Sequence, residues 1–362
     1  MLSALSRIIP PPTYITMPCI GVDISDNSLK YISFKPSLKD NSKRVLEQWG
    51  EITIPSGVVT GGDVGDPQKL TAVLKEFKDR TKAEFVRLSL PEERAYLFET
   101  EIKNNTPIRE IRGLLEFRLE ENVPIPSKEV FFDYAIIPSG SENKSVHVSV
   151  AAYAKQTVQS YYEACIAAGL RPVSFEVEAQ AMARSVVPNG TTGAVMVVDF
   201  GKTRTGVGIV YKNTLLYTST IDMGGEHLSQ VLRKSLGDKT DAELVLIKNT
   251  QGLVRGVDSS VVRDALLSTV SVVRDELATR MQYWHHRTGN QDDRKIKSIV
   301  LCGGSANLKG FPQYLSDTLN VPAIRGNVWE NAFSFENTVP PIDRPHSFGY
   351  AAAIGLALKS IT

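Results

Sequence analysis

VVDFGKTRTGVGIV, residues 197–210, is an apolar run that ends at Asp199 and is followed by a short loop of small and polar residues and a second apolar run. This pattern predicts a strand, a tight turn and a second strand. The same pattern occurs earlier, in GVDISDNSLKYISF, residues 21–34, where the first run ends at Asp23. The sequence therefore predicts two similar β-hairpins, each with an acidic residue at the end of its first strand.

Two hairpins of this kind, facing each other, would suit a triphosphate. Backbone N–H groups in tight loops bind phosphate oxygens, and Mg²⁺ prefers one or two carboxylates together with phosphate oxygens. Asp23 and Asp199 are therefore candidates to hold the waters of a Mg²⁺ ion. On its own, an aspartate at the end of a strand is ordinarily a turn or cap residue, so the candidacy depends on the pair.

Two further glycine-containing segments follow the second hairpin. In IVLCGGSANLKGF, residues 299–311, a buried strand is expected to run into Gly303 and Gly304, and Asn307 is expected to open a helix. Paired glycines allow a backbone to lie flat against a purine or a ribose. The segment DMGGEHL, residues 222–228, follows an expected strand at 217–221. Taken alone, its Gly224-Gly225 pair would be an ordinary turn.

The order of these four segments resembles the actin-like ATPase superfamily, in which two phosphate loops come first and an adenosine loop comes late. The resemblance implies an α/β, ribonuclease H-like fold with two lobes around a nucleotide cleft, and ATP with Mg²⁺ as the ligand. Carried over by position, the implied nucleotide-binding residues are Asp23, Ser25, Asn27, Lys30, Asp199, Gly201, Lys202, Thr203, Gly224, Gly225, Lys248, Gly303, Gly304 and Ser305.

Glu178 is the candidate catalytic residue. In FEVEAQAMA, residues 175–183, it matches the acidic residue that orients the attacking water in chaperone relatives. A residue in that role should hydrogen-bond a water in line with the γ-phosphorus. Capping of the helix that follows is the structural alternative. The resemblance implies at most a slow ATPase.

One stretch narrows the family. PIREIRGLLEFRLEENVPIPSKEVFFDYAII, residues 107–137, resembles a signature of the PilM family, the actin-like proteins of type IV pilus assembly. The matching positions are Glu110, Ile111, Arg112, Glu116, Pro124, Pro126, Glu129, Val130, Asp133 and Tyr134. Residues 146–183 resemble the strand–helix–strand return of the same family. The likeness extends over residues 18–360, nearly the whole chain.

The helix in that stretch also has a plainer interpretation. Apolar residues recur at spacings of three and four, as in any amphipathic helix that faces a core; they are Ile108, Ile111, Leu114, Leu115, Leu119 and Val123. The proline-bracketed exit and the Asp133-Tyr134 pair carry the family resemblance instead.

The PilM resemblance implies a domain organisation. The expected parts are a flexible tail at 1–16, a first lobe at 17–93 and 171–192, an inserted FtsA/PilM-type subdomain at 94–170, a second lobe at 193–339 and a closing first-lobe helix at 340–362. Within this organisation, residues 18–54 are expected to form three strands, and residues 66–82 and 258–287 one helix each.

The same resemblance implies a function. The chain would be a cytoplasmic scaffold at the inner face of the membrane, and it would bind the short N-terminal tail of a PilN-like membrane protein beside the inserted subdomain. Other type IV pilus platform proteins are expected partners, and membrane contact is expected only through partners. The alternatives are an FtsA-like filament-forming protein, for which a homo-oligomer stays open, and, with less support, a small-molecule kinase of the same superfamily.

Composition is that of a globular cytosolic protein. The 362 residues are 42% hydrophobic and carry a net charge of +1, which argues against a nucleic-acid partner. The three cysteines have no disulfide or metal spacing. Adjacent histidines at 285 and 286 point about 100° apart on a helix, so we do not expect them to chelate a metal together.

Two departures from the superfamily pattern bear on the nucleotide. Ser25 stands where relatives usually have glycine, and Asp26 beside it adds a carboxylate that would repel phosphates unless it faced solvent or metal. Relatives also carry Glu-x-x-Lys around the purine, whereas here Val245 precedes Lys248 at the position of the glutamate. Purine recognition is therefore the least certain part of the predicted site.

Overall fold

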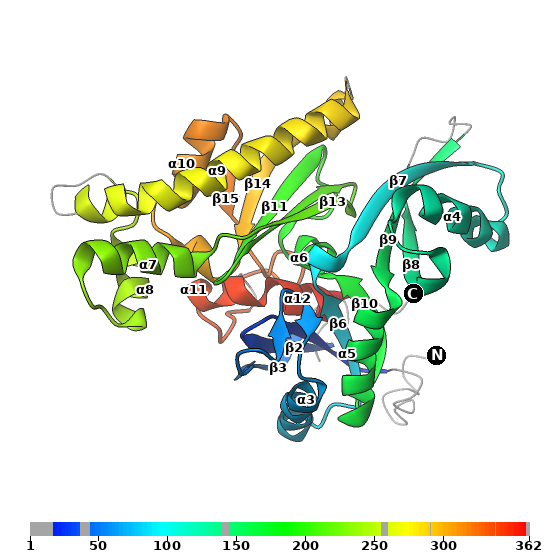
Figure 1. The fold of residues 1–362 in the computed structure, drawn as a ribbon, viewed down its shortest axis with the longest axis horizontal. Helices are drawn as coiled ribbons and strands as arrows, with labels where there is room; N and C mark the ends of the chain where they lie inside the picture. The colour runs from blue at the N-terminus through cyan, green and yellow to red at the C-terminus, as the bar shows by residue number, and fades with distance from the viewer. Residues whose placement is uncertain are drawn as a thin grey trace.

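The computed structural model describes residues 17–36, 44–138, 145–254, 260–289, 291–336 and 338–359. The expected tail at 1–16 lies outside these residues. The described part of the chain forms two lobes built on two five-stranded sheets, with a smaller sheet to one side (Figure 1). The mixed α/β class predicted from the sequence is confirmed.

The first lobe is built on a sheet with strand order β10-β6-β1-β2-β3. The chain runs antiparallel from β1 to β2 to β3, whereas β6 and β10 are parallel to β1. The strands are β1 (Cys19–Ile24), β2 (Ser28–Pro36), β3 (Arg44–Thr53), β6 (Phe85–Leu90) and β10 (Arg171–Val177). The three strands predicted between residues 18 and 54 are thereby confirmed.

One face of this sheet is covered by α3 (Pro67–Thr81) and α5 (Lys155–Ala167). Helix α3 begins as predicted, because the Asp66 side chain accepts a hydrogen bond from the Lys69 amide and Pro67 occupies the first turn. It ends where Lys82 adopts a left-handed conformation. A short pair of strands, β4 (Val59–Thr60) and β5 (Asp63–Val64), precedes it.

The second lobe repeats the topology of the first. Its strand order is β13-β12-β11-β14-β15, again an antiparallel meander followed by parallel strands. The strands are β11 (Ala194–Phe200), β12 (Thr205–Tyr211), β13 (Thr214–Ile221), β14 (Ile296–Cys302) and β15 (Ala323–Arg325). The helices are α7 (Gly225–Leu236), α8 (Asp241–Thr250), α9 (Ser260–Thr288), α10 (Phe311–Leu319) and α11 (Arg344–Ser347).

Two expectations in the second lobe have different outcomes. The long helix is confirmed as α9, and five residues that share one side of it are all buried: Val262, Leu266, Thr269, Val273 and Leu277. Asn307 does not open a helix: it ends the short 3-10 turn η5 (Gly304–Asn307), and α10 starts only at Phe311. The positive φ of Gly310, +81°, makes the turn between them.

Helices α6 (Glu178–Val186) and α12 (Ala351–Leu358) lie between the two sheets (Figure 1). Every residue of α12 is buried, and a 3-10 turn, η6 (Phe348–Tyr350), leads into it. The packing is tight, since a Cβ on Gly355 would lie 1.7 Å from the Ala181 carbonyl of α6. The sequence predicted such a packed closing helix.

A third unit contains a three-stranded sheet of order β7-β9-β8 and one helix. Its elements are β7 (Tyr96–Lys103), α4 (Ile108–Asn122), β8 (Val130–Ile136) and β9 (Ser145–Ala154). It has a separate core that includes Ile111, Leu115 and Leu119 of α4. Helix α5, which the sequence assigned to the insertion, contributes Tyr161 and Cys165 to the first-lobe core instead.

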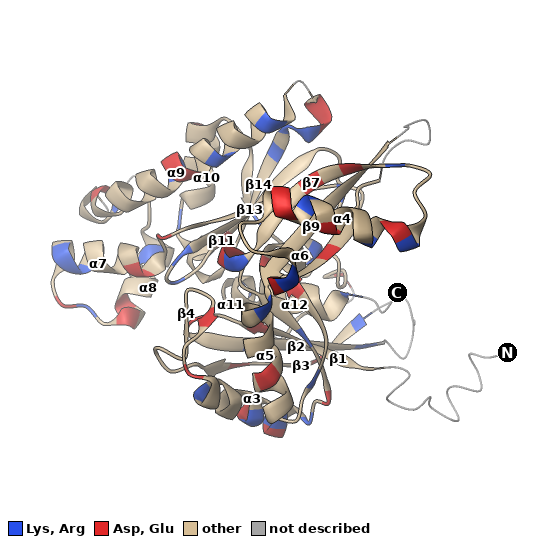
Figure 2. Cartoon of the chain, turned by 45° about the vertical axis from the view of Figure 1, so that its right-hand side comes forward, with Lys and Arg blue, Asp and Glu red and all other residues tan. Residues whose placement is uncertain are grey.

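Three further 3-10 turns complete the described elements: η1 (Glu92–Arg94), η2 (Ser127–Glu129) and η4 (Asp292–Arg294). Positive and negative side chains are interspersed over the helices of both lobes (Figure 2). None of the helices in the described part of the chain has the length and apolar content that crossing a membrane requires.

Candidate functional site

A cavity of about 890 Å³ lies between the two lobes. It is lined by β1, β2 and η1 of the first lobe and by the β11–β12 turn and η5 of the second. The predicted site residues that line it are Asp23, Ser25, Asn27, Lys30, Glu178, Asp199, Gly201, Lys202, Thr203, Gly303 and Gly304. Residues nearly 300 positions apart in the chain are thus brought to one cleft.

The β1–β2 hairpin forms one wall. Its turn is closed by a 2.9 Å hydrogen bond from the Ser25 amide to the Ser28 carbonyl, and the Ser25 hydroxyl bonds the same carbonyl. The serine that replaces glycine is therefore accommodated by the turn. Lys30 donates to the Ser28 hydroxyl at 2.6 Å and pairs with Glu51 at 3.2 Å, so its amine is held near the turn.

The β11–β12 hairpin forms the opposite wall, with a turn closed by a 3.0 Å hydrogen bond from the Gly201 amide to the Arg204 carbonyl. Asp199 pairs with Gly206 across the ladder. Gly303 lies against it: a Cβ there would be 2.1 Å from an Asp199 carboxylate oxygen, and the φ of Gly303 is +84°. Only glycine fits this approach without strain.

Carboxylates are concentrated at the floor of the cleft. Asp23 ends β1 and accepts a 2.7 Å hydrogen bond from Ser89, and Glu178 begins α6 directly after β10. Burial, together with the charge of Asp23, raises the pKa of Asp199 to about 6. Burial and the charge of Asp23 also raise the pKa of Glu178 well above the usual glutamate range. The burial of these carboxylates therefore disfavours their negative charge, and a cation beside them would favour it.

The structure adds residues that the sequence did not single out. Arg204, on the second-lobe hairpin, forms ion pairs with Asp26 at 2.5 Å and with Glu93, both from the first lobe. The extra carboxylate of Asp26 therefore faces the guanidinium of Arg204 rather than solvent or metal. This ion pair offsets the repulsion that the carboxylate would otherwise exert on phosphates. Glu92 also lines the cleft. A sequence signal for Glu92 exists, because it comes just after the short apolar run LSLP at 88–91, and Asp23 was identified as an acidic residue at the end of such a run.

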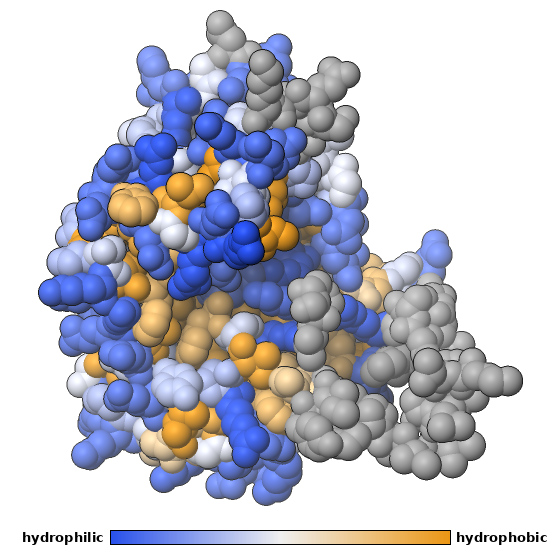
Figure 3. Space-filling view, turned by 90° about the vertical axis from the view of Figure 1, so that its right-hand side faces the viewer, coloured by the Kyte–Doolittle hydropathy of each residue, from blue (hydrophilic) through white to orange (hydrophobic). Residues whose placement is uncertain are grey.

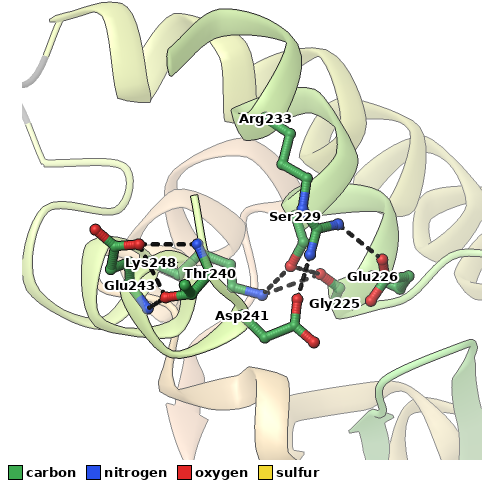
Figure 4. Close-up of polar contacts among 8 residues, drawn as sticks. All are labelled: Gly225, Glu226, Ser229, Arg233, Thr240, Asp241, Glu243 and Lys248. Atoms are coloured by element: carbon green, nitrogen blue, oxygen red, sulfur yellow. Dashed lines mark hydrogen bonds and ion pairs between the residues drawn. The ribbon is translucent and has the colours of Figure 1, made fainter. Parts of the chain in front are cut away.

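Four predicted residues are not among those that line the cavity: Gly224, Gly225, Lys248 and Ser305. Lys248 is buried and donates to the Gly225 carbonyl at 3.0 Å and to the Ser229 hydroxyl at 2.8 Å (Figure 4). The Ser305 hydroxyl donates to the Gly201 carbonyl at 2.9 Å. These hydrogen bonds join α7, α8 and η5 to one another and to the β11–β12 turn.

The end of the cleft where the purine is expected differs from the superfamily pattern. Val245 and Asn249, one turn apart on α8, line it, and Asn307, Asp343 and His346 face it from other segments. Helix α8 is fixed by a capping box in which Thr240 and Glu243 exchange hydrogen bonds (Figure 4). Lys248 is buried, so Val245 and Asn249 are the α8 residues that line the cavity.

A second cavity, about 430 Å³, separates the three-stranded unit from the first lobe. Strands β8 and β10 are both sheet edges and both contribute to it. Apolar lining comes from Phe131, Tyr134, Val158, Phe175 and Leu215. Hydrophobic residues gather between hydrophilic surfaces on this side of the molecule (Figure 3). We call this cavity the groove.

Charged residues lie at one end of the groove. Arg184 forms a bidentate pair with Glu176, which Lys359 also approaches at 3.7 Å. A further cavity of about 350 Å³ adjoins this end, since the two share Gln180, Arg184 and Asn213. An extended chain lying in the groove would therefore meet apolar side chains and two free strand edges first, and an ion-paired cluster after them.

Known proteins share this architecture. The chain of a PilM–PilN type IV pilus biogenesis complex superimposes with a TM-score of 0.74 at 23% identity, covering 95% of this chain and 98% of that one. The ethanolamine utilization protein EutJ from Carboxydothermus hydrogenoformans gives 0.52 at 17% identity, covering 97% and 90%. MreB5 of Spiroplasma citri bound to AMPPNP gives 0.51 at 13% identity, covering 93% of each chain. The actin-like fold is confirmed.

Sequence comparison gives the family. Residues 21–361 match the family described as type IV pilus assembly protein PilM. This match spans both lobes, the three-stranded unit and the closing helix, as the resemblance read from residues 107–137 implied. The chain therefore belongs to the PilM family of type IV pilus assembly proteins.

Proposed function

We propose that the cleft binds ATP with Mg²⁺. Asp23 and Asp199 would hold the hydrated cation, and the backbone at Gly201–Thr203 would bind the phosphates. The observation that supports this most strongly is the convergence of both hairpins and Gly303 on a single 890 Å³ cleft. A nucleotide analogue is bound in the similar MreB5 structure. Mg²⁺ would supply charge neutralisation for the phosphates.

Hydrolysis is a minor part of this proposal. Glu178 lines the cleft and is the candidate for orienting a water, and the pocket between α8 and η5 would receive the base. The nucleotide would act chiefly as a clamp between the lobes, because its phosphates would contact hairpins from both. Turnover is accordingly expected to be slow.

Calorimetry tests the nucleotide proposal. Mg-ATP should bind the intact chain, and Asp199→Ala should abolish the metal-dependent part of that binding. Glu84→Gln is a suitable control, since Glu84 pairs with Arg171 on the exposed edge of the sheet, away from the cleft. If the unaltered chain bound no ATP at any Mg²⁺ concentration, the proposal would be wrong.

We further propose that the groove binds the cytoplasmic N-terminal tail of a PilN-like membrane protein. One similar structure is a PilM–PilN complex. An extended peptide gains backbone hydrogen bonds from a free strand edge and specificity from side-chain pockets. The groove offers the edges of β8 and β10 together with Phe131, Tyr134 and Phe175. A short disordered tail loses entropy on binding, so we expect micromolar affinity, about −8 kcal/mol.

A charge placed in the groove tests this docking site. Ala135 is an exposed residue of β8 that lines the groove, and Ala167 is an exposed alanine of α5 outside it. Ala135→Glu should weaken binding of the tail peptide at least about tenfold, a loss of ~1.4 kcal/mol. Ala167→Glu should leave binding unchanged, and removal of the first ~15 residues of the cognate PilN should abolish it. Equal affinities for the two variants would contradict the site.

Together these two sites describe a scaffold of the type IV pilus inner-membrane platform. The chain would sit at the cytoplasmic face of the membrane and reach the membrane only through partners such as PilN. Nucleotide in the cleft would fix the two lobes, and the groove would hold the partner. Co-purification with PilN-like and PilO-like proteins from the native cell would support this placement.

A further inference from the structure

We propose that Glu92 is a third carboxylate of the cation site in the cleft, acting beside Asp23 and Asp199 through the waters of a hydrated divalent cation. This inference rests on the proposed binding of Mg-ATP and extends it to a residue outside the two phosphate hairpins. Three observations carry it: the topology of the first sheet, the fit against Gly206, and an unpaired oxygen.

Topology brings Glu92 to the floor of the cleft. Strand β6 lies between β1 and β10 and runs parallel to both. The carboxyl ends of parallel neighbours meet at one edge of a sheet. Asp23 is the second-to-last residue of β1, Glu92 follows β6 by two residues, and Glu178 follows β10 directly. All three carboxylates line the same cavity.

The fit against Gly206 places Glu92 beside Asp199. Gly206 is the direct cross-strand partner of Asp199 in the β11–β12 ladder. Directly opposed residues present their Cβ atoms on one face, about 4.5–5.5 Å apart. A Cβ on Gly206 would lie 1.7 Å from a carboxylate oxygen of Glu92. The Glu92 carboxylate therefore occupies the space that a side chain at position 206, opposite Asp199, would occupy. In this way a carboxylate of the first lobe lies against the β11–β12 hairpin of the second lobe.

The remaining carboxylate oxygen has no partner. Glu92 is only 5% exposed, and its Oε2 accepts no hydrogen bond from the described residues. Asp26 Oδ1 also accepts no hydrogen bond, but it forms an ion pair with Arg204 at 2.5 Å. Asp23 accepts from Ser89, and Glu93 pairs with Arg204. A buried carboxylate oxygen without a donor is costly, and such a group signals a missing ion or water.

The electrostatic surroundings of Glu92 also favour a cation beside it. Burial, followed by the charges of Asp199 and Glu93, raises the pKa of Glu92 well above the usual glutamate range. Two basic residues at the cleft already pair with other carboxylates, since Arg204 pairs with Asp26 and Glu93, and Lys30 pairs with Glu51. Lys202 also lines the cleft. A bound cation would add positive charge beside Glu92 and Asp199.

The cation would be hydrated rather than chelated directly. Among the described residues, no three His, Cys, Asp or Glu side chains have the geometry of a direct metal site. Mg²⁺ releases its waters reluctantly and usually keeps several of them. Glu92 would then accept hydrogen bonds from coordinated water, as outer-shell carboxylates do in metal sites.

The test uses the intact chain and Mn²⁺, which replaces Mg²⁺ and is visible by electron paramagnetic resonance. Free Mn²⁺ is titrated with the unaltered chain, Glu92→Gln and the surface control Glu84→Gln, each with and without ATP. Glu92→Gln should weaken Mn²⁺ binding about 10- to 100-fold, the usual cost of losing an outer-shell partner. Without metal it should also raise the melting temperature more at high pH than at low pH, because the amide cannot ionise in the buried site. Glu84→Gln should match the unaltered chain in both measurements.

Gly206→Ala provides a second variant, since its Cβ would displace the Glu92 carboxylate, and it should weaken Mn²⁺ binding in the same direction. If Glu92→Gln bound Mn²⁺ as tightly as the unaltered chain while only its melting temperature changed, Glu92 would be a structural residue and the inference would be overturned. If the unaltered chain bound neither Mn²⁺ nor Mn-ATP, the proposed nucleotide function itself would fail. The two failures are thus distinguishable.

Discussion

Single residues at the cleft show both what local pattern can predict and what it misses. Asp23 and Asp199 were predicted because each ends an apolar run before a small-residue loop, and both line the cleft. Arg204 and Glu92 were missed because their roles depend on neighbours far away in sequence. Arg204 meets Asp26 and Glu93 only across the two lobes. Lys248, predicted from its position in a motif, donates to the Gly225 carbonyl and does not line the cleft, and its contact with a nucleotide stays a prediction.

The pKa of Asp199 leads to a prediction about stability. Its folded value of about 6 exceeds the usual aspartate value of 3.8, so the folded state binds this proton more tightly than the unfolded state. Stability from this group is therefore full below pH ~4 and falls as the pH rises to ~6, by up to about 3 kcal/mol. Asp199→Asn should remove that fall.

Urea unfolding at pH 4.5 and pH 7.5, without divalent cations, measures this difference. The variant should gain stability over the unaltered chain at pH 7.5 and much less at pH 4.5. Added Mg²⁺ should stabilise the unaltered chain more at the higher pH, because the carboxylate is then charged. A stability difference between the two proteins that did not change with pH would contradict the prediction.

For single helices, the apolar periodicity of the sequence predicted the type of element correctly but did not predict which of its apolar residues are buried. The apolar spacing of residues 108–123 predicted a core-facing helix, and α4 is that helix. Ile111, Leu115 and Leu119 are buried, but Ile108 is 79% and Leu114 46% exposed, so the expectation that all six apolar residues face a core was wrong. A single three-stranded sheet covers only one face of α4, which leaves the other apolar residues outside.

Substitutions on the buried and exposed faces of α4 test which of its apolar residues contribute to stability. Leu115 is fully buried in the core of the three-stranded unit, whereas Phe117 on the same helix is 75% exposed. Leu115→Ala should cost about 2–5 kcal/mol of unfolding free energy, and Phe117→Ala should stay within about 0.5 kcal/mol of the unaltered chain. Denaturant unfolding checks both. A larger loss for Phe117→Ala would show that α4 packs through its other face.

At the scale of the whole molecule, the two lobes and their shared topology followed from two similar hairpins and a superfamily resemblance. The way the helices between the two sheets pack could not be predicted, because it depends on close approaches between backbones. Helices α6 and α12 meet where Gly355 faces the Ala181 carbonyl, and β1 meets α12 where Gly21 faces Ala353. Glycine at these positions has no periodic or compositional signature in a sequence.

A pair of glycine substitutions tests this view of the helix packing. Gly355→Ala would place a Cβ 1.7 Å from the Ala181 carbonyl, so it should cost about 1–3 kcal/mol or more through overpacking. Gly113→Ala, in the exposed middle of α4, meets nothing within 4 Å and should instead stabilise by about 0.5–1 kcal/mol. Thermal unfolding of the two variants should show a lower melting temperature for Gly355→Ala and a higher one for Gly113→Ala. Stabilisation by Gly355→Ala would mean that the two helices are not in close contact.

The central claim is that this PilM family member holds a partner's tail between the edges of β8 and β10. Amide hydrogen exchange of the intact chain, with and without a PilN-like N-terminal peptide, tests it most directly. The account predicts slower exchange in residues 130–136 and 171–177, with the exposed amides of α4 unchanged. Protection confined to the second lobe, residues 193–339, or no protection at saturating peptide, would contradict it.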